Sequence, residues 1–316
     1  MSFLGDIGRL LFTADLWHAT LEAAVLLLLP ALGGVISERS GVVNIAMEGM
    51  MLTGAFFAVV ATLAWHNPWL GVLVAMLAGG LIALIHAVVS IRFRADQIVS
   101  GVAINIFAAG LTVFLANRFY GLQDVGHIGP AALLPNVNIP ILSGIPFFGR
   151  VLFQQNVIVY VALILLVATH VVLFRTRLGL RIRAVGEHPQ AADTAGINVF
   201  LIRYAAVVTS GLLCGISGAF LSIGISNTFV QNMTSGRGYI ALAAMIFGKW
   251  TPFGAFVACM IFGLGQAIYD NNSIISISPY LLSMLPYILT LVVLAAVVRR
   301  SSPPAADGIP YIPGAQ

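Results

Sequence analysis

Five polar residues lie in otherwise apolar stretches of this sequence: Asn44, Glu48, Gln97, Ser100 and Asn105. A charged carboxylate at the centre of a bilayer costs on the order of 3 kcal/mol. Glu48 must therefore face the protein interior, be paired, be protonated or lie near the surface. One interpretation is that these groups line or brace the path of a polar solute. The other is that they form structural hydrogen bonds that fix helix packing.

The spacing of Asn44 and Glu48 predicts a shared helix face, because residues at i and i+4 are neighbours on a helix. Gln97, Ser100 and Asn105 fall together on a later predicted helix. Their uncharged donors and acceptors suit a hydroxylated solute, and they suit helix–helix hydrogen bonds equally well.

A second group of residues follows an Arg-rich stretch and predicts a docking element. Pro189 fits the first turn of a short helix, and Gly196 fits its end. We expect a short helix with a small-residue face that lies parallel to the membrane and docks in a groove of a partner; a solvated linker is the alternative. The residues assigned to it are Gly186, Glu187, His188, Pro189, Ala191, Ala192, Asp193 and Gly196.

Catalytic and metal-binding motifs are missing from the sequence. It contains no Walker A loop, no HExxH motif and no nucleophile elbow. Cys214 and Cys259 lie in apolar stretches without metal-type spacing, so we predict neither a catalytic nor a metal site. If transport is active, its energy comes from a separate chain or an ion gradient.

The composition predicts a membrane protein. Apolar residues make up 59% of the 316 residues and charged residues only 8%, whereas soluble domains carry roughly 25% charged residues. Too little charge is present to cover a water-soluble surface. The net charge of +4 is typical of cytoplasmic anchoring rather than nucleic-acid binding.

Apolar stretches of about 20 residues, the length that spans a bilayer, recur along the chain. We predict an all-α polytopic membrane bundle of about 8–10 spans with one broken or short helix at 238–248. The predicted spans are 19–37, 41–64, 69–91, 97–117, 156–174, 201–223, 253–270 and 279–298.

Arg and Lys residues set the predicted orientation, because cytoplasmic loops are enriched in them. They place the loop at 175–200 inside and the Pro-rich loop at 120–154 outside. Residues 1–18 are expected to form an interfacial segment, 19–300 the transmembrane domain, and 301–316 a disordered cytoplasmic tail.

An internal similarity relates the segment that begins at Asn44 to the one that begins at Tyr239, each preceded by a Gly-containing turn. Transporters are often built from repeats that meet near broken helices. A repeat and chance similarity between Ala- and Ile-rich helices both fit this pattern.

Three segments carry a family resemblance: 37–56, 177–198 and 236–250. They resemble the permease subunits of bacterial ABC importers, in the simple-sugar and nucleoside branch related to ribose and branched-chain amino-acid permeases. The similarity extends from about residue 19 to 300. The Glu48-Gly49 pair and the short N-terminus favour the nucleoside-like group.

The resemblance implies an inner-membrane subunit that pairs with a homologous permease, as a homo- or heterodimer, and is not an enzyme. It would bind no cofactor; a cytoplasmic ATPase would use ATP, and an external solute-binding protein would deliver the solute. On this view the helix after Pro189 is the coupling helix. The alternative is a proton-coupled secondary transporter that works through Glu48.

Overall fold

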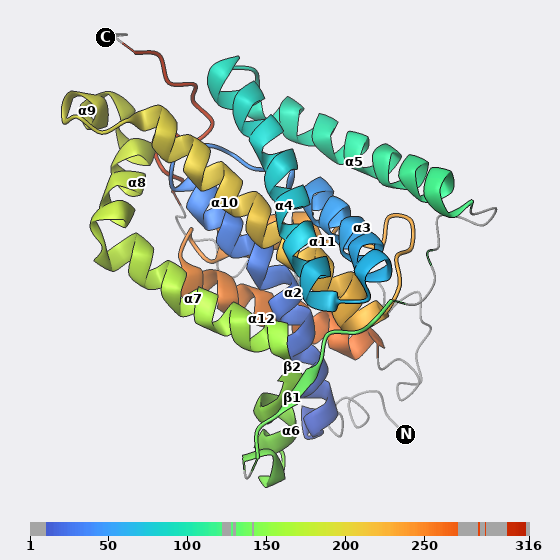
Figure 1. Cartoon of the computed structure of the whole chain (residues 1–316). Helices are drawn as coiled ribbons and strands as arrows, with labels where there is room; N and C mark the ends of the chain where they lie inside the picture. The colour runs from blue at the N-terminus through green and yellow to red at the C-terminus, as the bar shows by residue number, and fades with distance from the viewer. Residues whose placement is uncertain are drawn as a thin grey trace.

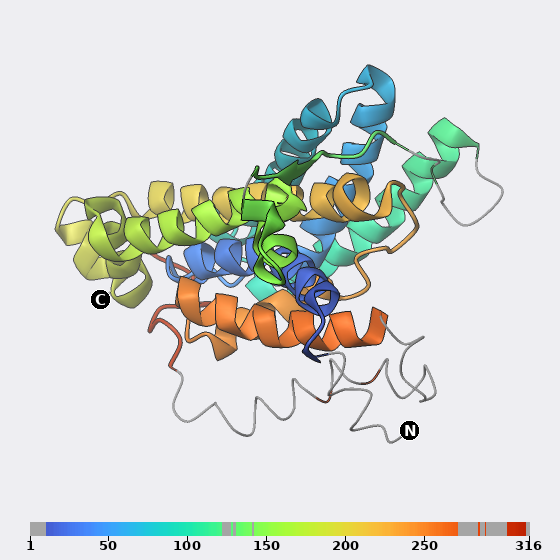
Figure 2. The same ribbon diagram turned by 90° about the horizontal axis from the view of Figure 1, so that it is seen from below.

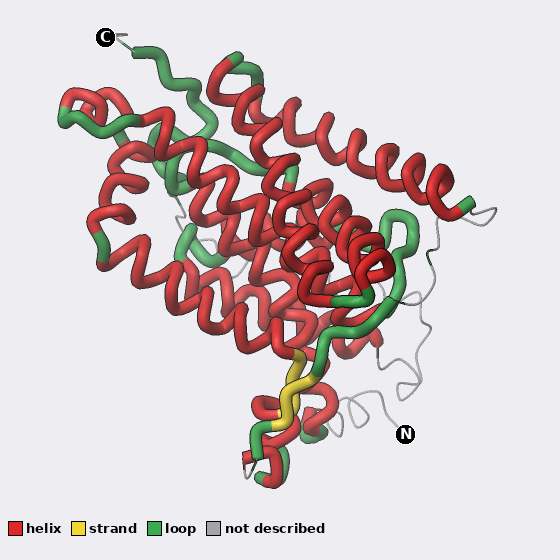
Figure 3. The backbone as a smooth tube through the Cα atoms, viewed as in Figure 1, coloured by secondary structure: helices red, strands yellow, loops and turns green. Residues whose placement is uncertain are grey.

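The computed structural model describes residues 11–121, 128, 131–140, 142–270, 284, 288 and 302–313. Within them the chain is almost entirely helical (Figure 3), which confirms the all-α prediction. Seven described helical segments are long and apolar enough to cross a membrane. They are α2 (Ala14–Glu38), α3 (Met47–Trp65), α4 with η1 (Pro68–Ala87 and Val88–Arg92), α5 (Gln97–Tyr120), α7 (Val157–Arg175), α10 with η3 (Val199–Ala219 and Phe220–Ser226) and α12 (Pro252–Asp270).

These seven segments correspond to the first seven predicted spans. The predicted broken helix is α11 (Arg237–Phe247), which is too short to cross a membrane alone and confirms that prediction. The eighth predicted span, 279–298, lies outside the described residues apart from two isolated positions. The internal repeat stays a prediction.

The start of the second span differs from the prediction. The apolar stretch begins near residue 41, but α3 begins only at Met47, and residues 42–44 have no regular secondary structure. Gly41 has a φ of +87°, a left-handed conformation that favours glycine and turns the chain out of α2. Composition cannot reveal this break, because the non-helical residues are as apolar as the helix that follows them.

Helix α2 is the centre of the bundle. It lies between α10 and α12 (Figure 2), and it also packs against α7 and α11. The spacing of Gly211, Gly215 and Gly218 in the sequence predicts a small-residue face that permits close helix contact. This face of α10 packs against α2, α3 and α4. A Cβ added at Gly33 of α2 would lie 2.9 Å from the Ser210 backbone, and one at Gly54 of α3 would lie 2.7 Å from the Gly215 Cα.

The loop at 120–154, which is predicted to be external and is called the external loop below, contains ordered structure in its described part. Strands β1 (Asn136–Asn138) and β2 (Gln154–Asn156) form an antiparallel pair in which Asn136 lies opposite Asn156. The 3-10 turn η2 (Leu142–Gly144) and helix α6 (Phe148–Phe153) lie between them. The sequence from Phe147 to Gln155 predicts a short interfacial helix, and α6 confirms that a helix forms there. The first span begins at Ala14, inside the segment predicted to be separate from it.

At the opposite end of the bundle, the loop at 175–200 forms helix α8 (Arg177–Glu187) and helix α9 (Pro189–Thr194) (Figure 1). The tail that we expected to be disordered is ordered over 302–313 and packs beside them. Its prolines and lack of an aliphatic run suggested disorder, but Ala306 and Tyr311 are buried against the bundle.

The close packing of α10 makes a direct prediction. Gly215→Val should lower the apparent melting temperature of the purified protein strongly, because the new side chain would meet the backbone of Ala75 and Met76. Overpacking of this kind costs about 1–3 kcal/mol or more. Gly110→Val on α5 is the matched control, since nothing lies within 4 Å of the added Cβ. Equal melting temperatures for the two variants would contradict this packing.

Candidate functional site

The non-helical segment from Gly41 to Ala46 is held by side chains of neighbouring helices. The Val43 N–H donates to Gln97 Oε1 at 2.7 Å, and His86 Nε2 lies 3.0 Å from Val43 O. The other ring nitrogen of His86, Nδ1, lies 2.9 Å from Ser100 Oγ. Non-helical backbone persists within a membrane only where protein or water satisfies it. Gln97 and His86 meet that requirement, and Ser100 orients the His86 ring.

Asn105 on α5 bonds to both sides of the break. Its Nδ2 donates to Ile45 O at 2.9 Å, and its Oδ1 accepts from the Gly49 N–H at 2.8 Å. Gly49 lies in the first turn of α3, where backbone N–H groups lack partners within the helix. Asn105 Nδ2 also donates to the Tyr239 hydroxyl at 2.9 Å. Tyr239 is 44% exposed, so this tyrosine extends the network to the surface of the chain.

Asn44 lies before α3, not on it. The predicted helix face shared with Glu48 is therefore wrong, because the helix begins three residues later, at Met47. The Asn44 Oδ1 instead accepts from the Ala46 N–H at 3.1 Å, and its Nδ2 donates to Ser210 Oγ at 2.8 Å. Asn44 thus fixes the turn into α3 and ties it to α10.

Glu48 caps the start of α11. Its Oε1 accepts from Thr234 Oγ1 at 2.6 Å and from the Gly236 N–H at 2.8 Å, and its Oε2 accepts from the Gly238 N–H at 2.7 Å. A Cβ at Gly238 would lie 2.5 Å from the Glu48 nitrogen, so only glycine permits this approach. Glu48 is also in the first turn of α3. One carboxylate therefore lies at the positive ends of two helices.

All five predicted path residues thus belong to one buried network around the start of α3. Each is at most 8% exposed. That they line the solute path stays a prediction. The network also contains residues that sequence reasoning did not assign to it, and an isolated His or Ser in an apolar helix gives little signal of a partner on another helix. These are His86, Ser210, Thr234 and Tyr239.

The predicted docking residues lie together at the opposite, Arg-rich end of the bundle from the external loop. Pro189 occupies the first turn of α9, and Gly196 follows the helix with a φ of +80°, so both predicted helix boundaries are confirmed. Gly186 and Glu187 end α8, and His188 joins the two helices. Ala191 and Asp193 are exposed, whereas Ala192 is only 4% exposed and faces the bundle.

A cavity of about 180 Å³ opens between the N-terminal half of α2, η3, α11 and α12. Its lining includes the polar residues Glu22, Arg237 and Gln266 and the apolar residues Leu26 and Phe262. None of the five predicted path residues lines it. The cavity therefore combines polar and apolar surface within a single chain.

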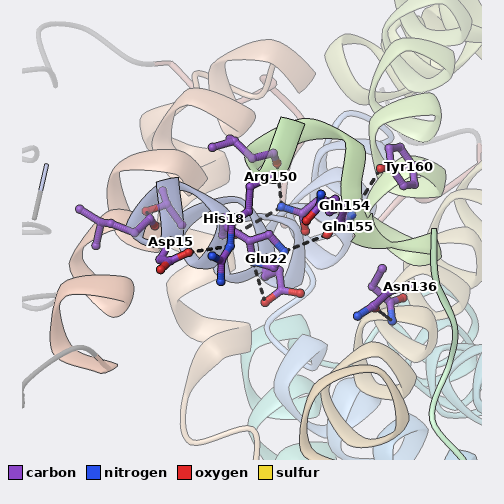
Figure 4. Close-up of polar contacts among 12 residues, drawn as sticks. Asp15, His18, Glu22, Asn136, Arg150, Gln154, Gln155 and Tyr160 are labelled. Atoms are coloured by element: carbon purple, nitrogen blue, oxygen red, sulfur yellow. Dashed lines mark hydrogen bonds and ion pairs between the residues drawn. The ribbon is translucent and has the colours of Figure 1, made fainter. Parts of the chain in front are cut away.

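Next to the N-terminal end of α2, polar contacts dock the external loop onto the bundle (Figure 4). Asp15 Oδ1 lies 2.6 Å from Arg150 Nε, and His18 Nε2 lies 3.0 Å from Gln154 O. The Asp15–Arg150 pair is exposed, and pairs of this kind contribute little to stability. These contacts hold α6 against the N-terminal end of α2.

Metal binding finds no support among the described residues, where no group of three His, Cys, Asp or Glu side chains could hold an ion. Cys214 and Cys259 are both fully buried within the bundle, in agreement with a packing role.

The family model described as "Branched-chain amino acid transport system / permease component" matches residues 18–294. No solved structure matches the chain.

Three relatives match nearly the whole chain. The guanosine ABC transporter permease protein NupQ of Bacillus subtilis is 46% identical, over 94% of this chain and 96% of its own. The nucleoside ABC transporter permease protein NupC of Lactococcus lactis is 42% identical, over 90% and 93%. TsgC13 of Haloferax volcanii, whose name gives glucose as its solute, is 36% identical, over 92% and 94%.

The network predicts that Asn105→Leu destabilises the protein. The substitution leaves the Gly49 N–H and the Ile45 carbonyl without their partner, and each unsatisfied buried group costs about 1–3 kcal/mol. We expect a clear fall in melting temperature, measured in detergent or nanodiscs. Asn117→Leu, an exposed position on the same helix, is the control and should change little. If the two variants melt alike, the Asn105 bonds do not stabilise the break.

Proposed function

Since the chain belongs to the family of branched-chain amino acid transport system permease components, we propose that it imports a nucleoside as the membrane subunit of an ABC importer. It is a transport subunit rather than an enzyme, and it is a multi-pass protein of the bacterial inner membrane. The observation that carries the proposal is the 42–46% identity to permeases named for guanosine and nucleosides over nearly the whole chain.

The electrostatics of the broken helix favour an uncharged solute. In transporters, the positive ends of half-helices commonly face an anionic substrate group. Here Glu48 occupies the start of α11 and accepts hydrogen bonds from two of its backbone N–H groups. Because the protein supplies its own anion, a neutral nucleoside fits this arrangement better than a phosphorylated one. The mixed cavity lined by Arg237 and Phe262 also suits a molecule with a flat aromatic base and a polar ribose.

A simple sugar is the second candidate solute. The Haloferax volcanii relative named for glucose supports it. A sugar would need mainly hydrogen-bonding groups, whereas the cavity lining also includes the apolar side chains of Leu26 and Phe262. These apolar side chains favour the nucleoside.

We assign the polar network to the framework of the solute path. Its five predicted residues form hydrogen bonds mainly with the backbone around the break or with side chains that hold it. They are Asn44, Glu48, Gln97, Ser100 and Asn105. In this proposal they keep the start of α3 in shape beside the path, and the hydroxyl of the exposed Tyr239 is the group of the network that solute can reach.

Coupling to ATP hydrolysis would occur through α9. A cytoplasmic ABC ATPase would dock on its exposed face at Ala191 and Asp193 and would bind the ATP, because this sequence lacks a phosphate-binding loop. The complete importer would also contain a second homologous permease and an external solute-binding protein. The apolar exposed faces of α4 and α5 are available for that permease and for lipid.

A proton-coupled transporter agrees less well with the geometry. Proton transfer through Glu48 would require its carboxylate to be protonated in each cycle. Protonation would remove the negative charge that lies at the starts of α3 and α11 and would weaken the hydrogen bonds from the Gly236 and Gly238 N–H groups. The start of α11 would lose part of its stabilisation in each cycle.

The test is uptake of labelled guanosine into proteoliposomes that contain the chain with its partner permease, ATPase and binding protein. We expect ATP-dependent uptake that adenosine and uridine reduce and glucose does not. Competition by glucose alone would favour the sugar. Uptake without the ATPase, abolished by a protonophore, would establish the secondary transporter instead.

The docking assignment predicts that Ala191→Trp abolishes uptake, because a large side chain on the exposed face of α9 would prevent this helix from entering the groove of the ATPase. The matched control is Ala191→Ser, which keeps the side chain small and should retain uptake. Ala192 is unsuitable for this purpose, since it is buried and its replacement would disturb the fold. Normal ATPase binding and uptake by Ala191→Trp would refute the assignment. Co-purification of the ATPase and uptake are the two measurements.

A further inference from the structure

The C-terminal segment 302–313, here called the strap, lies against the coupling region at the cytoplasmic end. In Figure 1 it runs beside the start of α10 and the end of α8. Ala306 is 6% exposed and Tyr311 is 4% exposed, whereas Ile312 is 45% exposed. The strap is therefore packed through specific residues and is not a loose extension.

The strap bonds to the end of α8, directly before α9. The Ala306 N–H donates to Gly186 O at 2.9 Å, and the Ala305 N–H donates to Glu187 Oε2 at 3.2 Å. Carbonyls in the last turn of a helix lack partners within that helix. The other side of Gly186 touches the Arg39 carbonyl so closely that no Cβ would fit. Gly186 is thus held between the strap and the end of the first span.

The strap also bonds to the start of α10 and reaches the turn into α3. Arg203 is 1% exposed, and its guanidinium donates to Ile309 O at 3.0 Å. A Cβ at Gly41 would lie 2.8 Å from the Arg203 guanidinium and 3.0 Å from Ala306 O. Burial raises the pKa of the Asp307 carboxyl to about 7, and the nearby Arg203 opposes that rise.

An apolar contact completes the attachment. The Tyr311 ring packs edge-on against Phe200 with ring centres 5.5 Å apart. It belongs to a small buried cluster with Val185 of α8, Ala192 of α9 and Val199 of α10. One aromatic side chain therefore joins three helices.

We propose that the strap locks α9, the start of α10 and the turn before α3 into one rigid unit, so that a movement of α9 is transmitted directly to the broken start of α3. The strap stays docked throughout the cycle. This proposal rests on the proposed function, in which the ATPase moves α9. Tyr311 acts in it as a positioning residue.

The first test compares Tyr311→Ala with Ile312→Ala, which are adjacent positions, one buried and one exposed. Hydrogen exchange on the purified permease reports on the strap without any solute or ATPase. In Tyr311→Ala we expect exchange at 39–46 and at 186–196 to rise together by about tenfold or more, since both segments lose the same support. Ile312→Ala should match the wild type. Unchanged exchange, or a rise in one segment only, would overturn the proposal.

In the reconstituted importer, Tyr311→Ala should keep its ATPase bound and hydrolysing while solute moved per ATP falls by about tenfold, a loss of about 1.4 kcal/mol in coupling. If Tyr311→Ala moves as much solute per ATP as the wild type, the proposal is wrong. Loss of ATPase binding would also overturn it, because the strap would then be only a part of the docking surface. A wild-type importer without ATP-driven nucleoside uptake would refute the proposed function, while the exchange measurement would still judge the strap.

Discussion

The structure depends on one constraint: the non-helical backbone between α2 and α3 must find its hydrogen bonds inside the bundle. Most residues of this segment are buried, and an unsatisfied buried N–H or C=O costs about 1–3 kcal/mol. Gln97, His86 and Asn105 supply the partners from α4 and α5, and Asn44 supplies one from within the break. The polar residues of this otherwise apolar chain are therefore concentrated where helical hydrogen bonding stops.

The same constraint explains the position of α11. A helix of 11 residues that starts within the bundle leaves its first N–H groups without partners. Glu48 bonds to two of these groups and places its charge where the dipoles of α3 and α11 both favour it. Two interrupted helices thus share one carboxylate, so a change at either start affects the other. In a transporter that alternates between states, this shared carboxylate would couple the movements of the two helix starts.

The sequence predicts whatever depends on periodicity and composition. It predicts the helical class, the seven described spans, the short α11, the boundaries of α9 and the small-residue face of α10. It does not predict the delayed start of α3, because the residues of the break are as apolar as the helix after it, and only the partners on other helices identify it. The buried Arg203 and the ordered strap are missed for the same reason. The prolines of the strap and the charge of Arg203 suggest exposure to solvent. In the folded chain, however, the strap packs against Phe200 and Gly186, and Arg203 lies beside Gly41.

The central claim is that the polar groups around the break are committed to the backbone rather than to solute. Residue-resolved hydrogen exchange of the wild-type protein in nanodiscs, with and without guanosine, tests it at the Val43, Gly49 and Gly238 amides. Our account predicts strong protection of all three that solute does not change. Exchange as fast as in the external loop, or protection that develops only when solute is added, would contradict it.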